Sequence, residues 1–262
     1  MSIKHTLAAT AVVCLAFGGV AGCGNSSGDS GKDDGKKAGS PSGDQGRAQG
    51  KPNGVEKLSA QQISEKARAE LKNASSLRLV MDTAAAKTDL AIDRDGNCSG
   101  TAGSAKGQME IIKRGEDVYV KPDSQFWATQ GGSKGAAAKE VVGDRYIKTS
   151  VNDPQFGQAA GMCDLDAFTK DMDGDNDDKM AKGGTSTVDG VPVVALKGTK
   201  GSDKSTLYVA TVGKPYVIKI VGTDDGRPAS MGFKDYDKPV PSRTPGAGEV
   251  LDAAKLKELG TS

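Results

Sequence analysis

The chain has 262 residues, of which 36% are hydrophobic and 26% charged, and its formal net charge is +1. This balance excludes the basic surface that nucleic-acid-binding domains usually carry. With five Phe, five Tyr and one Trp, few side chains are available to stack on bases. We expect a single folded domain, because the first quarter of the chain has too little apolar content to form a core.

The first 22 residues have the pattern of a signal peptide. Lys4 supplies a positive charge, and the apolar run Leu7 to Val20 is too short to span a bilayer comfortably. The run ends in Val-Ala-Gly before Cys23, which resembles the bacterial lipobox, whose cysteine is diacylated and becomes the new N-terminus. The resemblance implies that Cys23 is lipidated, with palmitate-type chains that anchor the protein at the outer face of the cytoplasmic membrane, on the extracellular side. The alternative is an ordinary signal peptide with an incidental cysteine.

Residues 23–54 are predicted to be a lipidated cysteine followed by a disordered tether. Nine of the residues 24–54 are Gly, and no large apolar side chain occurs among them. Such a segment cannot bury enough surface to offset the entropy lost on ordering. A cell-wall spacer and a solubilising leader both fit this composition. The folded domain is expected to occupy residues 55–262.

The domain should open with one amphipathic helix. Ser59 and Gln62 form a capping-box pattern, and small apolar residues then recur at helical spacing to about Asn73. Their narrow face suits a helix that lies on a sheet.

The first half of the domain reads as an antiparallel meander. Alternating or β-branched runs bounded by turn residues predict strands at four places: near Leu77 to Met81, Asp89 to Asp93, Gln108 to Lys113 and Asp117 to Lys121. Phe126 and Trp127 follow as a short apolar piece.

A crossover region follows this first meander. A helix is expected at Ala136 to Val142, then an irregular link at Arg145 to Ile147, and a short helix at Leu165 to Met172. Asp164 near the start of the last helix suits the helix dipole.

The second half contains five further runs rich in Val, Ile, Thr and Tyr, separated by Gly, Pro and Asp: Thr185 to Val188, Val191 to Leu196, Ser205 to Ala210, Tyr216 to Ile220 and Met231 to Tyr236. These runs bring the expected total to nine or ten strands. A final helical turn or two is expected at Ala253 to Leu259.

Two cysteines remain after the signal peptide and the lipidated position are set aside. Cys98 and Cys163 form an even pair in a chain that we expect to be exported, so a disulfide between them is predicted. The alternative is two unpaired thiols.

The order of these parts resembles the actinobacterial lipoproteins of the LppX/LprG type and, more distantly, the LolA/LolB lipoprotein carriers. The phrases that carry the resemblance include Asp117-Val-Tyr-Val-Lys121, Val188-Asp-Gly-Val191 and Phe233-Lys-Asp-Tyr236. The resemblance covers about residues 55–250. It implies an α+β fold: a strongly bent, half-open antiparallel β-sheet, an incomplete barrel, with helices covering its concave face. It also implies that an acyl chain or lipidated molecule is held between sheet and helices.

The candidate cavity face consists of alternating apolar positions: Leu77, Leu79, Met81, Met109, Ile111, Val118, Val120, Leu207, Val209, Ile218, Ile220, Met231 and Phe233. The inventory is lean for a large lipid cavity. The same residues can equally form an ordinary filled core.

Catalytic chemistry has little support. The only His is His5, inside the expected signal peptide, which excludes a Ser-His-Asp triad and His-ligated zinc or copper in the mature chain. A weak calcium candidate is formed by Asp171, Asp173, Asp175 and Asp177, but Asn176 and Lys182 stand where an EF-hand needs Gly and Glu. A solvated acidic turn is the simpler interpretation, so no metal or cofactor is expected.

The sequence therefore predicts a non-enzymatic, membrane-anchored exported lipoprotein, monomeric, that binds a hydrophobic ligand for carriage or presentation at the cell envelope. The alternative is an envelope interaction or sensor module with a filled core and no lipid ligand. An elongated cavity between sheet and helix would favour the first function, and a continuous dry core the second.

Overall fold

The computed structural model describes residues 50–130, 132–153, 157–172, 180–200 and 203–260. By compactness the chain divides into Met1–Gly43 and Asp44–Ser262, and all described residues belong to the second unit. Its strands are β1 (Ser76–Asp82), β2 (Lys87–Asp93), β3 (Cys98–Ser104), β4 (Gly107–Arg114), β5 (Asp117–Pro122), β6 (Tyr146–Ser150), β7 (Ala181–Val188), β8 (Val191–Lys200), β9 (Asp203–Ala210), β10 (Val217–Asp224), β11 (Arg227–Lys234) and β12 (Val250–Asp252). Its helices are α1 (Ala60–Asn73), α2 (Ser124–Gln130), α3 (Gly132–Val142), α4 (Gly157–Gly161), α5 (Leu165–Asp171) and α6 (Ala253–Gly260), with short 3-10 turns at Val55–Lys57 and Ala247–Glu249.

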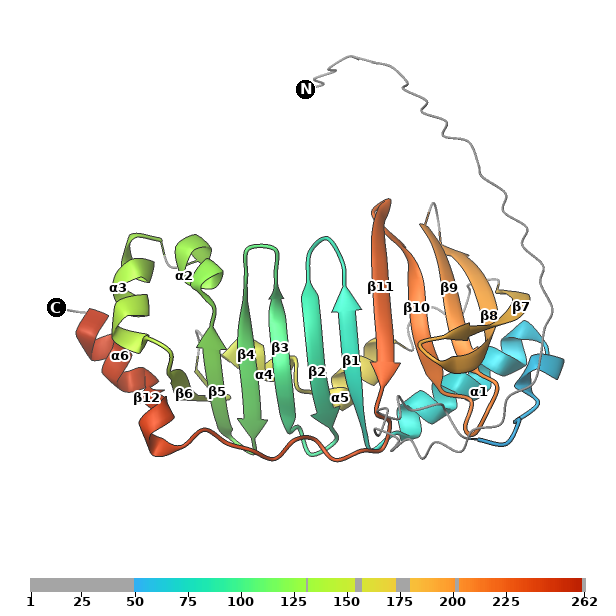
Figure 1. Cartoon of the computed structure of the whole chain (residues 1–262), viewed down its shortest axis with the longest axis horizontal. Helices are drawn as coiled ribbons and strands as arrows, with labels where there is room; N and C mark the ends of the chain where they lie inside the picture. Colours follow the sequence, from blue (N-terminus) through green and yellow to red (C-terminus); the bar gives the residue numbers. More distant parts are fainter. Residues whose placement is uncertain (1–49, 131, 154–156, 173–179, 201–202, 261–262) are drawn as a thin grey trace, which may run out of the picture. The chain divides into compact units, whose positions relative to one another are not determined.

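The strands form one open sheet in the order β12-β6-β5-β4-β3-β2-β1-β11-β10-β9-β8-β7 (Figure 1). Two meanders, β1 to β6 and β7 to β11, meet where β1 pairs with β11. All neighbours are antiparallel except β12, which runs parallel to β6. The expected α+β class with a half-open sheet is confirmed, and the parallel β12 is a departure from the all-antiparallel expectation.

Helix α1 begins where the sequence predicted. The Ser59 hydroxyl accepts a hydrogen bond from the Gln62 backbone N–H, and the Gln62 side chain accepts one from the Ser59 N–H, which completes the capping box. The helix buries Ile63, Ala67 and Leu71, one narrow face, against the sheet. The predicted helices at α3, α5 and α6 are also present, and the Asp164 carboxylate caps α5 by accepting from the Ala167 N–H at 2.8 Å.

One face of the sheet, here called the inner face, carries the main core. It presents Leu79, Ile111 and Phe233, and helices α1 and α5 lie on it. The Phe168 ring of α5 lies 6.2 Å from the Phe233 ring, centroid to centroid. A smaller cluster of Val193, Ala210 and Ile218 occupies the opposite, outer face.

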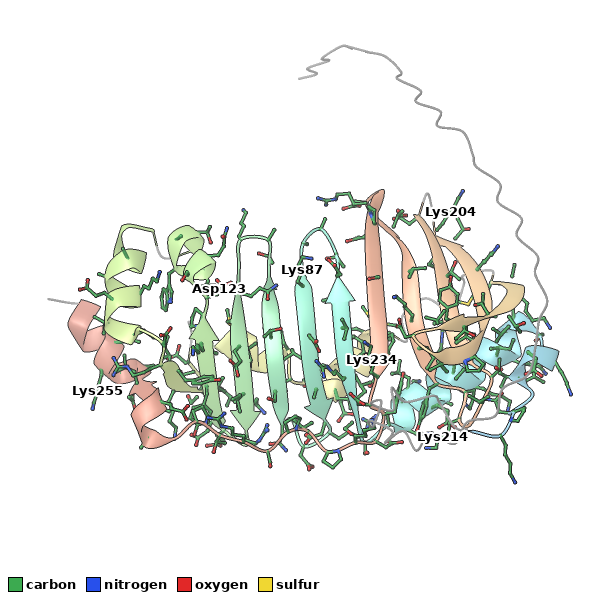
Figure 2. All side chains as sticks on the ribbon, viewed as in Figure 1. Lys87, Asp123, Lys204, Lys214, Lys234 and Lys255 are labelled. Atoms are coloured by element: carbon green, nitrogen blue, oxygen red, sulfur yellow. A yellow bond between two sulfur atoms is a disulfide. The ribbon has the colours of Figure 1, made fainter. Side chains whose placement is uncertain are left out.

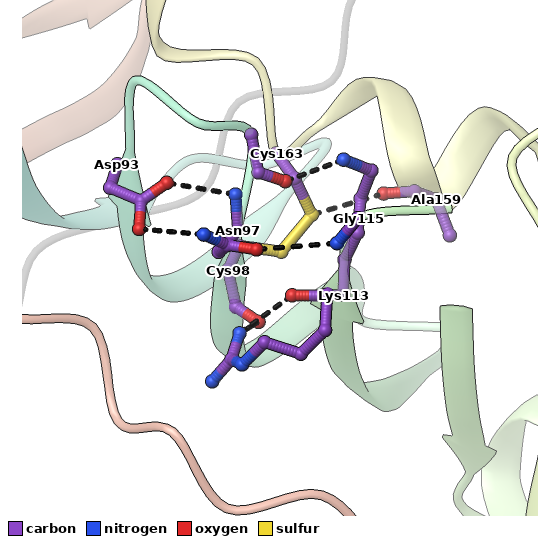
Figure 3. Close-up of a disulfide and its surroundings, with 9 residues drawn as sticks. Asp93, Asn97, Cys98, Lys113, Gly115, Ala159 and Cys163 are labelled. Atoms are coloured by element: carbon purple, nitrogen blue, oxygen red, sulfur yellow. Dashed lines mark hydrogen bonds between the residues drawn. A yellow bond between two sulfur atoms is a disulfide. The ribbon is translucent and has the colours of Figure 1, made fainter. Parts of the chain in front are cut away.

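The disulfide between Cys98 and Cys163 is present, with 5.4 Å between the two Cα atoms (Figure 3). Both cysteines are buried. The turn before β3 is fixed by Asp93, whose carboxylate accepts hydrogen bonds from the backbone and side-chain amides of Asn97. The disulfide therefore joins the segment between α4 and α5 to the first half of the sheet, as predicted.

Several sequence expectations need correction. In the described part of the chain the sheet has twelve strands rather than nine or ten, because β3, β6 and β12 were not expected as strands. Arg145 to Ile147 was expected as an irregular link, but Tyr146–Ser150 pairs with β5. Phe126 and Trp127 lie in helix α2, whose start is capped by the Asp123 carboxylate through the Phe126 N–H at 2.6 Å.

The folded part also starts earlier than residue 55. Pro52 forms a β-bridge with Val212, and the Asn53 side-chain amide donates to the carbonyls of Ala210 and Gly213. These bonds fix the last residues of the segment that composition alone assigned to the tether. Within the described residues, no helix combines the length and apolar content needed to cross a membrane.

Candidate functional site

Two rows of side chains cross the inner face in register. The first, here called the buried row, runs over seven strands through Ile147, Val120, Ile111, Gly100, Leu90, Leu79 and Phe233. Apart from Gly100, which is half-buried, each member is at most 6% exposed. A side chain with almost no accessible surface does not line a space that water can enter. The buried row is therefore packed core.

The second row lies two residues farther along each strand. This methionine row runs through Pro122, Met109, Ala102, Thr88, Met81, Met231, Ile220, Leu207 and Leu196. Its two ends are buried, and so are Ala102 and Thr88 between Met109 and Met81. The four remaining members are half-buried: Met109, Met81, Met231 and Ile220. Met is unbranched and adaptable, so these positions can repack around a guest more easily than the buried row can.

A third row limits the inner face toward the ends of the strands. On β11, β10, β9 and β8 it consists of Ala229, Gly222, Ser205 and Gly198, all small. Large buried residues, half-exposed methionines and small rim residues thus follow one another along the strands. Figure 2 shows Lys87, Asp123 and Lys204 near the same ends of the strands, and by register Lys87 and Lys204 belong to the outer face. The inner face therefore has an apolar floor and, on β8 to β11, a rim of small residues.

The candidate cavity residues divide between these environments. Nine are buried, and Met81, Met109, Ile220 and Met231 are half-buried. Twelve belong to the inner face. Ile218 does not: an irregularity in the β10–β9 register between Val217 and Lys219 sends Val217 to the inner face and Ile218 to the outer cluster. Simple alternation along β10 was wrong at this point, because a bulge shifts the side-chain period by one residue.

A cleft of about 380 Å³ lies where the methionine row reaches β4 and β5. Met109, Pro122 and Trp127 form its apolar part, and Gln108, Lys121 and Lys139 are among its polar lining. Beside it, the Tyr146 hydroxyl donates to the Glu110 carboxylate at 2.5 Å. Burial, together with this carboxylate, raises the pKa of Tyr146 above its ordinary value. Thr101, Glu110 and Lys121, which also line the cleft, are register partners one residue out of phase with Met109 and Pro122, so the polar part of the cleft belongs to the outer face.

A second cleft, of about 520 Å³, lies beside the disulfide and is lined in part by Arg94, Lys113 and Asp166. Arg94 forms an ion pair with Asp166, and the Lys113 ammonium donates to the Gly96 carbonyl at 2.5 Å. The charged groups of Arg94, Asp166 and Lys113 are thus engaged within the protein.

A polar network lies at the ends of the strands opposite the rim, where β1 and β10 begin and β11 ends. The Tyr216 hydroxyl donates to Asp237 at 2.6 Å, and the ring of Tyr216 stacks on Tyr236 at 4.0 Å. The bond from Tyr216, together with the Ser75 backbone N–H, lowers the pKa of Asp237 to about 2. Burial raises the pKa of Tyr236, whose hydroxyl donates to the Val217 carbonyl. We interpret this network as structural.

The calcium prediction is untested. Asp171 ends α5, and Asp173, Asp175 and Asp177 lie outside the described residues. Among the residues that are described, no group of His, Cys, Asp or Glu side chains could hold a metal ion.

Sequence reasoning missed several residues of the inner face, namely Leu90, Ile92, Thr88, Ala102 and Leu196. Leu90 and Ile92 alternate with Asp89 and Ala91 within β2, which was predicted as a strand. This alternation could have placed both residues on the inner face. Ala102 and Thr88 gave no such signal, because a small residue and a polar one show their role only through the register.

The chain resembles several solved structures of bacterial proteins. LprF from Mycobacterium bovis matches with 16% identity over 72% of this chain and 97% of its own, at a TM-score of 0.48. The lipoprotein LppX from Mycobacterium tuberculosis matches with 11% identity over 70% of this chain and 98% of its own, at 0.45. A LolA superfamily protein from Nitrosomonas europaea matches with 15% identity over 72% and 96%, at 0.25.

No family model matches the chain, and no curated protein matches it by sequence.

Proposed function

We propose that this chain is an exported lipoprotein, anchored through Cys23 at the outer face of the cytoplasmic membrane, that binds an acyl-chain or lipid ligand. The observation that carries the proposal is a set of four half-buried apolar side chains in the methionine row, Met109, Met81, Met231 and Ile220, on an otherwise buried inner face. Burial of apolar surface contributes about 25 cal/mol per Å². Contact with these side chains can therefore give useful affinity without any catalytic group.

The ligand would lie along Met109, Met81 and Met231, between the buried row and the small residues of the rim. The protein would act by holding and presenting the ligand, as a monomer and without a cofactor.

The decisive experiment compares two adjacent positions of β11 that face opposite sides of the sheet. Met231 points to the inner face, and Ser230 points to the outer face; both are half-buried. Met231→Glu places a carboxylate against the proposed acyl chain and should weaken binding of cis-parinaric acid at least tenfold, measured by its fluorescence. Ser230→Glu adds the same charge on the other face and should leave binding unchanged. Equal effects of the two variants, or no binding to the unaltered chain, would contradict the proposal.

The anchor has its own test. Cys23→Ala should abolish labelling by radioactive palmitate and move the protein from the membrane fraction to the soluble fraction. A variant that stays labelled and membrane-bound would refute the role of Cys23.

A second function is favoured by the buried row, which is packed as in an ordinary core. In that case the chain is an envelope interaction module. Native mass spectrometry on the purified domain distinguishes the two, since a co-purifying lipid of defined mass supports carriage. Absence of lipid, together with no rise in Tm on adding fatty acids, supports the interaction module.

A further inference from the structure

The two edges of the sheet differ in how they are protected. At one end, β12 has three residues and leads directly into α6. At the other end, β7 has eight residues, six of them exposed, and it is the last strand of the sheet. Natural proteins usually shield an edge with a short strand, a charge, a Pro or a covering helix. From Gly183 to Val188 the β7 edge carries neither charge nor Pro.

The backbone of β7 offers free hydrogen-bonding groups at defined positions. Asp189 and Gly190, with φ of 49° and 81°, form the two-residue turn that joins Val188 to Val191. In such a hairpin the flanking pair is hydrogen-bonded and the next pair is not. The N–H and C=O groups of Thr187 and Thr185 therefore point away from β8. Within the described residues, nothing hydrogen-bonds to them.

The side chains around this edge define what it could bind. On the outer face, Val188 and Val191 extend the cluster of Val193, Ala210 and Ile218 to the edge and remain half-buried. At the other end of β7, Gly183 has no side chain, and the Cε atom of Lys197 lies 3.7 Å from the position its Cβ would take. Lys197 is exposed, and none of the described residues forms an ion pair with it. The edge thus combines an apolar position, free backbone groups and a cation.

We propose that β7 binds an extended peptide segment of a partner protein by strand addition. The segment runs antiparallel to β7, carries a β-branched residue opposite Val188, and places an Asp or Glu opposite Gly183, within reach of Lys197. Main-chain hydrogen bonds supply affinity in this mode, and alternate side chains supply specificity. The inference is independent of lipid binding on the inner face.

A second copy of the chain fits this edge less well than a peptide. The register irregularity between Lys182 and Thr185 leaves only Thr185 to Val188 as a regular edge. Pairing of two such short edges would bury far less than the roughly 800 Å² per partner that stable complexes need. A peptide adapts to the irregularity, whereas a second rigid edge does not.

The test uses the soluble chain that starts at residue 24 and a fluorescein-labelled peptide, Lys-Thr-Val-Thr-Val-Thr-Glu-Thr, as the probe. Fluorescence polarisation should show saturable binding, and replacing Glu by Lys in the peptide should weaken it at least fivefold. Lys197→Glu should reverse that preference. Thr187→Pro removes the outward N–H without removing a hydrogen bond to β8, and it should weaken binding at least tenfold. Thr187→Ala keeps the N–H and should bind normally.

Each other outcome overturns the proposal. No saturation up to 1 mM peptide, or equal binding by Thr187→Pro and Thr187→Ala, would show that β7 adds no strand. If light scattering finds that the unaltered chain is a dimer and that Thr187→Pro is a monomer, the edge binds a second copy instead. Because Lys197 is exposed, its variant remains informative if the Pro variant does not fold.

Discussion

Breaking the disulfide should destabilise the fold by an amount that follows from the length of the loop that it closes. Cys98 and Cys163 are 65 positions apart. In the chain-entropy treatment, closing a loop of that length stabilises the fold by about 4 kcal/mol. For a domain of this size, such a loss corresponds to a fall in Tm of about 8–16 °C.

The assay is guanidinium unfolding of the soluble chain, oxidised and after full reduction, followed by circular dichroism. Because both cysteines are buried, the double variant Cys98→Ala/Cys163→Ala provides a second route that needs no access for the reductant. Reduction and the double variant should lower the free energy of unfolding by similar amounts. The variant should lose slightly more, because it also lacks two buried sulfur atoms. The denaturant dependence of the free energy should rise on reduction, because the unfolded chain without the cross-link is less compact and exposes more surface.

Reduction of the disulfide should also destabilise α5 more than the rest of the domain. The disulfide holds the segment that leads into α5, whose Phe168 contacts Phe233. Amide hydrogen exchange in α5 should therefore rise more on reduction than exchange in α1, which is independently capped. A stability loss under about 1 kcal/mol, or equal exchange in the two helices, would refute the reasoning.

Three further predictions concern single residues. Phe233→Ala removes a ring that is 1% exposed and should cost about 3–5 kcal/mol in urea unfolding; a loss below 1 kcal/mol would mean that the core there is not packed. Ser59→Ala removes the hydroxyl of the capping box and should cost about 1 kcal/mol, with Ser59→Asp, which can still cap, as the control that should lose little. Asp237 has its pKa lowered from 3.8 to about 2, so its contribution is complete above about pH 4 and is lost as the pH falls through 2. Asp237→Asn should therefore show a smaller fall in Tm between pH 4 and pH 2 than the unaltered chain, and parallel curves would contradict this.

The sequence was informative wherever a local signal determines the structure. The capping box at Ser59 fixes the start of α1, and the Asp189-Gly190 turn fixes the hairpin of β7 and β8. Both depend on a few neighbouring residues. The disulfide followed from counting cysteines, because only one pair remained.

Strand β3 shows why the rest could not be predicted. Its sequence, Cys-Ser-Gly-Thr-Ala-Gly-Ser, has little β-propensity, and the strand forms because β2 and β4 pair with it on both sides. A Cβ atom on Gly100 would lie 2.0 Å from the Asp89 carbonyl oxygen, so the small residue is required by the close approach of the neighbouring strand. Such a requirement exists only once the sheet is assembled.

The candidate site depends on register in the same way. The methionine row exists because β1 pairs with β11, which aligns Met81 with Met231. No local pattern indicates which distant strands become neighbours. The bulge that moved Ile218 to the outer face was equally invisible in the alternating sequence of β10.

The pairing of β1 with β11 also determines when the first half of the domain is complete. Strands β1 to β6 are synthesised well before β11, so the backbone edge of β1 has no partner while the rest of the chain is being made. Leu77 and Leu79, on β1, are at most 6% exposed in the complete sheet. A chain shortened before Arg227 would keep β1 to β6 and β7 to β10 but lose the strand that joins them. The backbone edge of β1 would then be open to neighbouring chains, a state prone to aggregation. The strand made near the end of the chain therefore keeps the earlier part soluble.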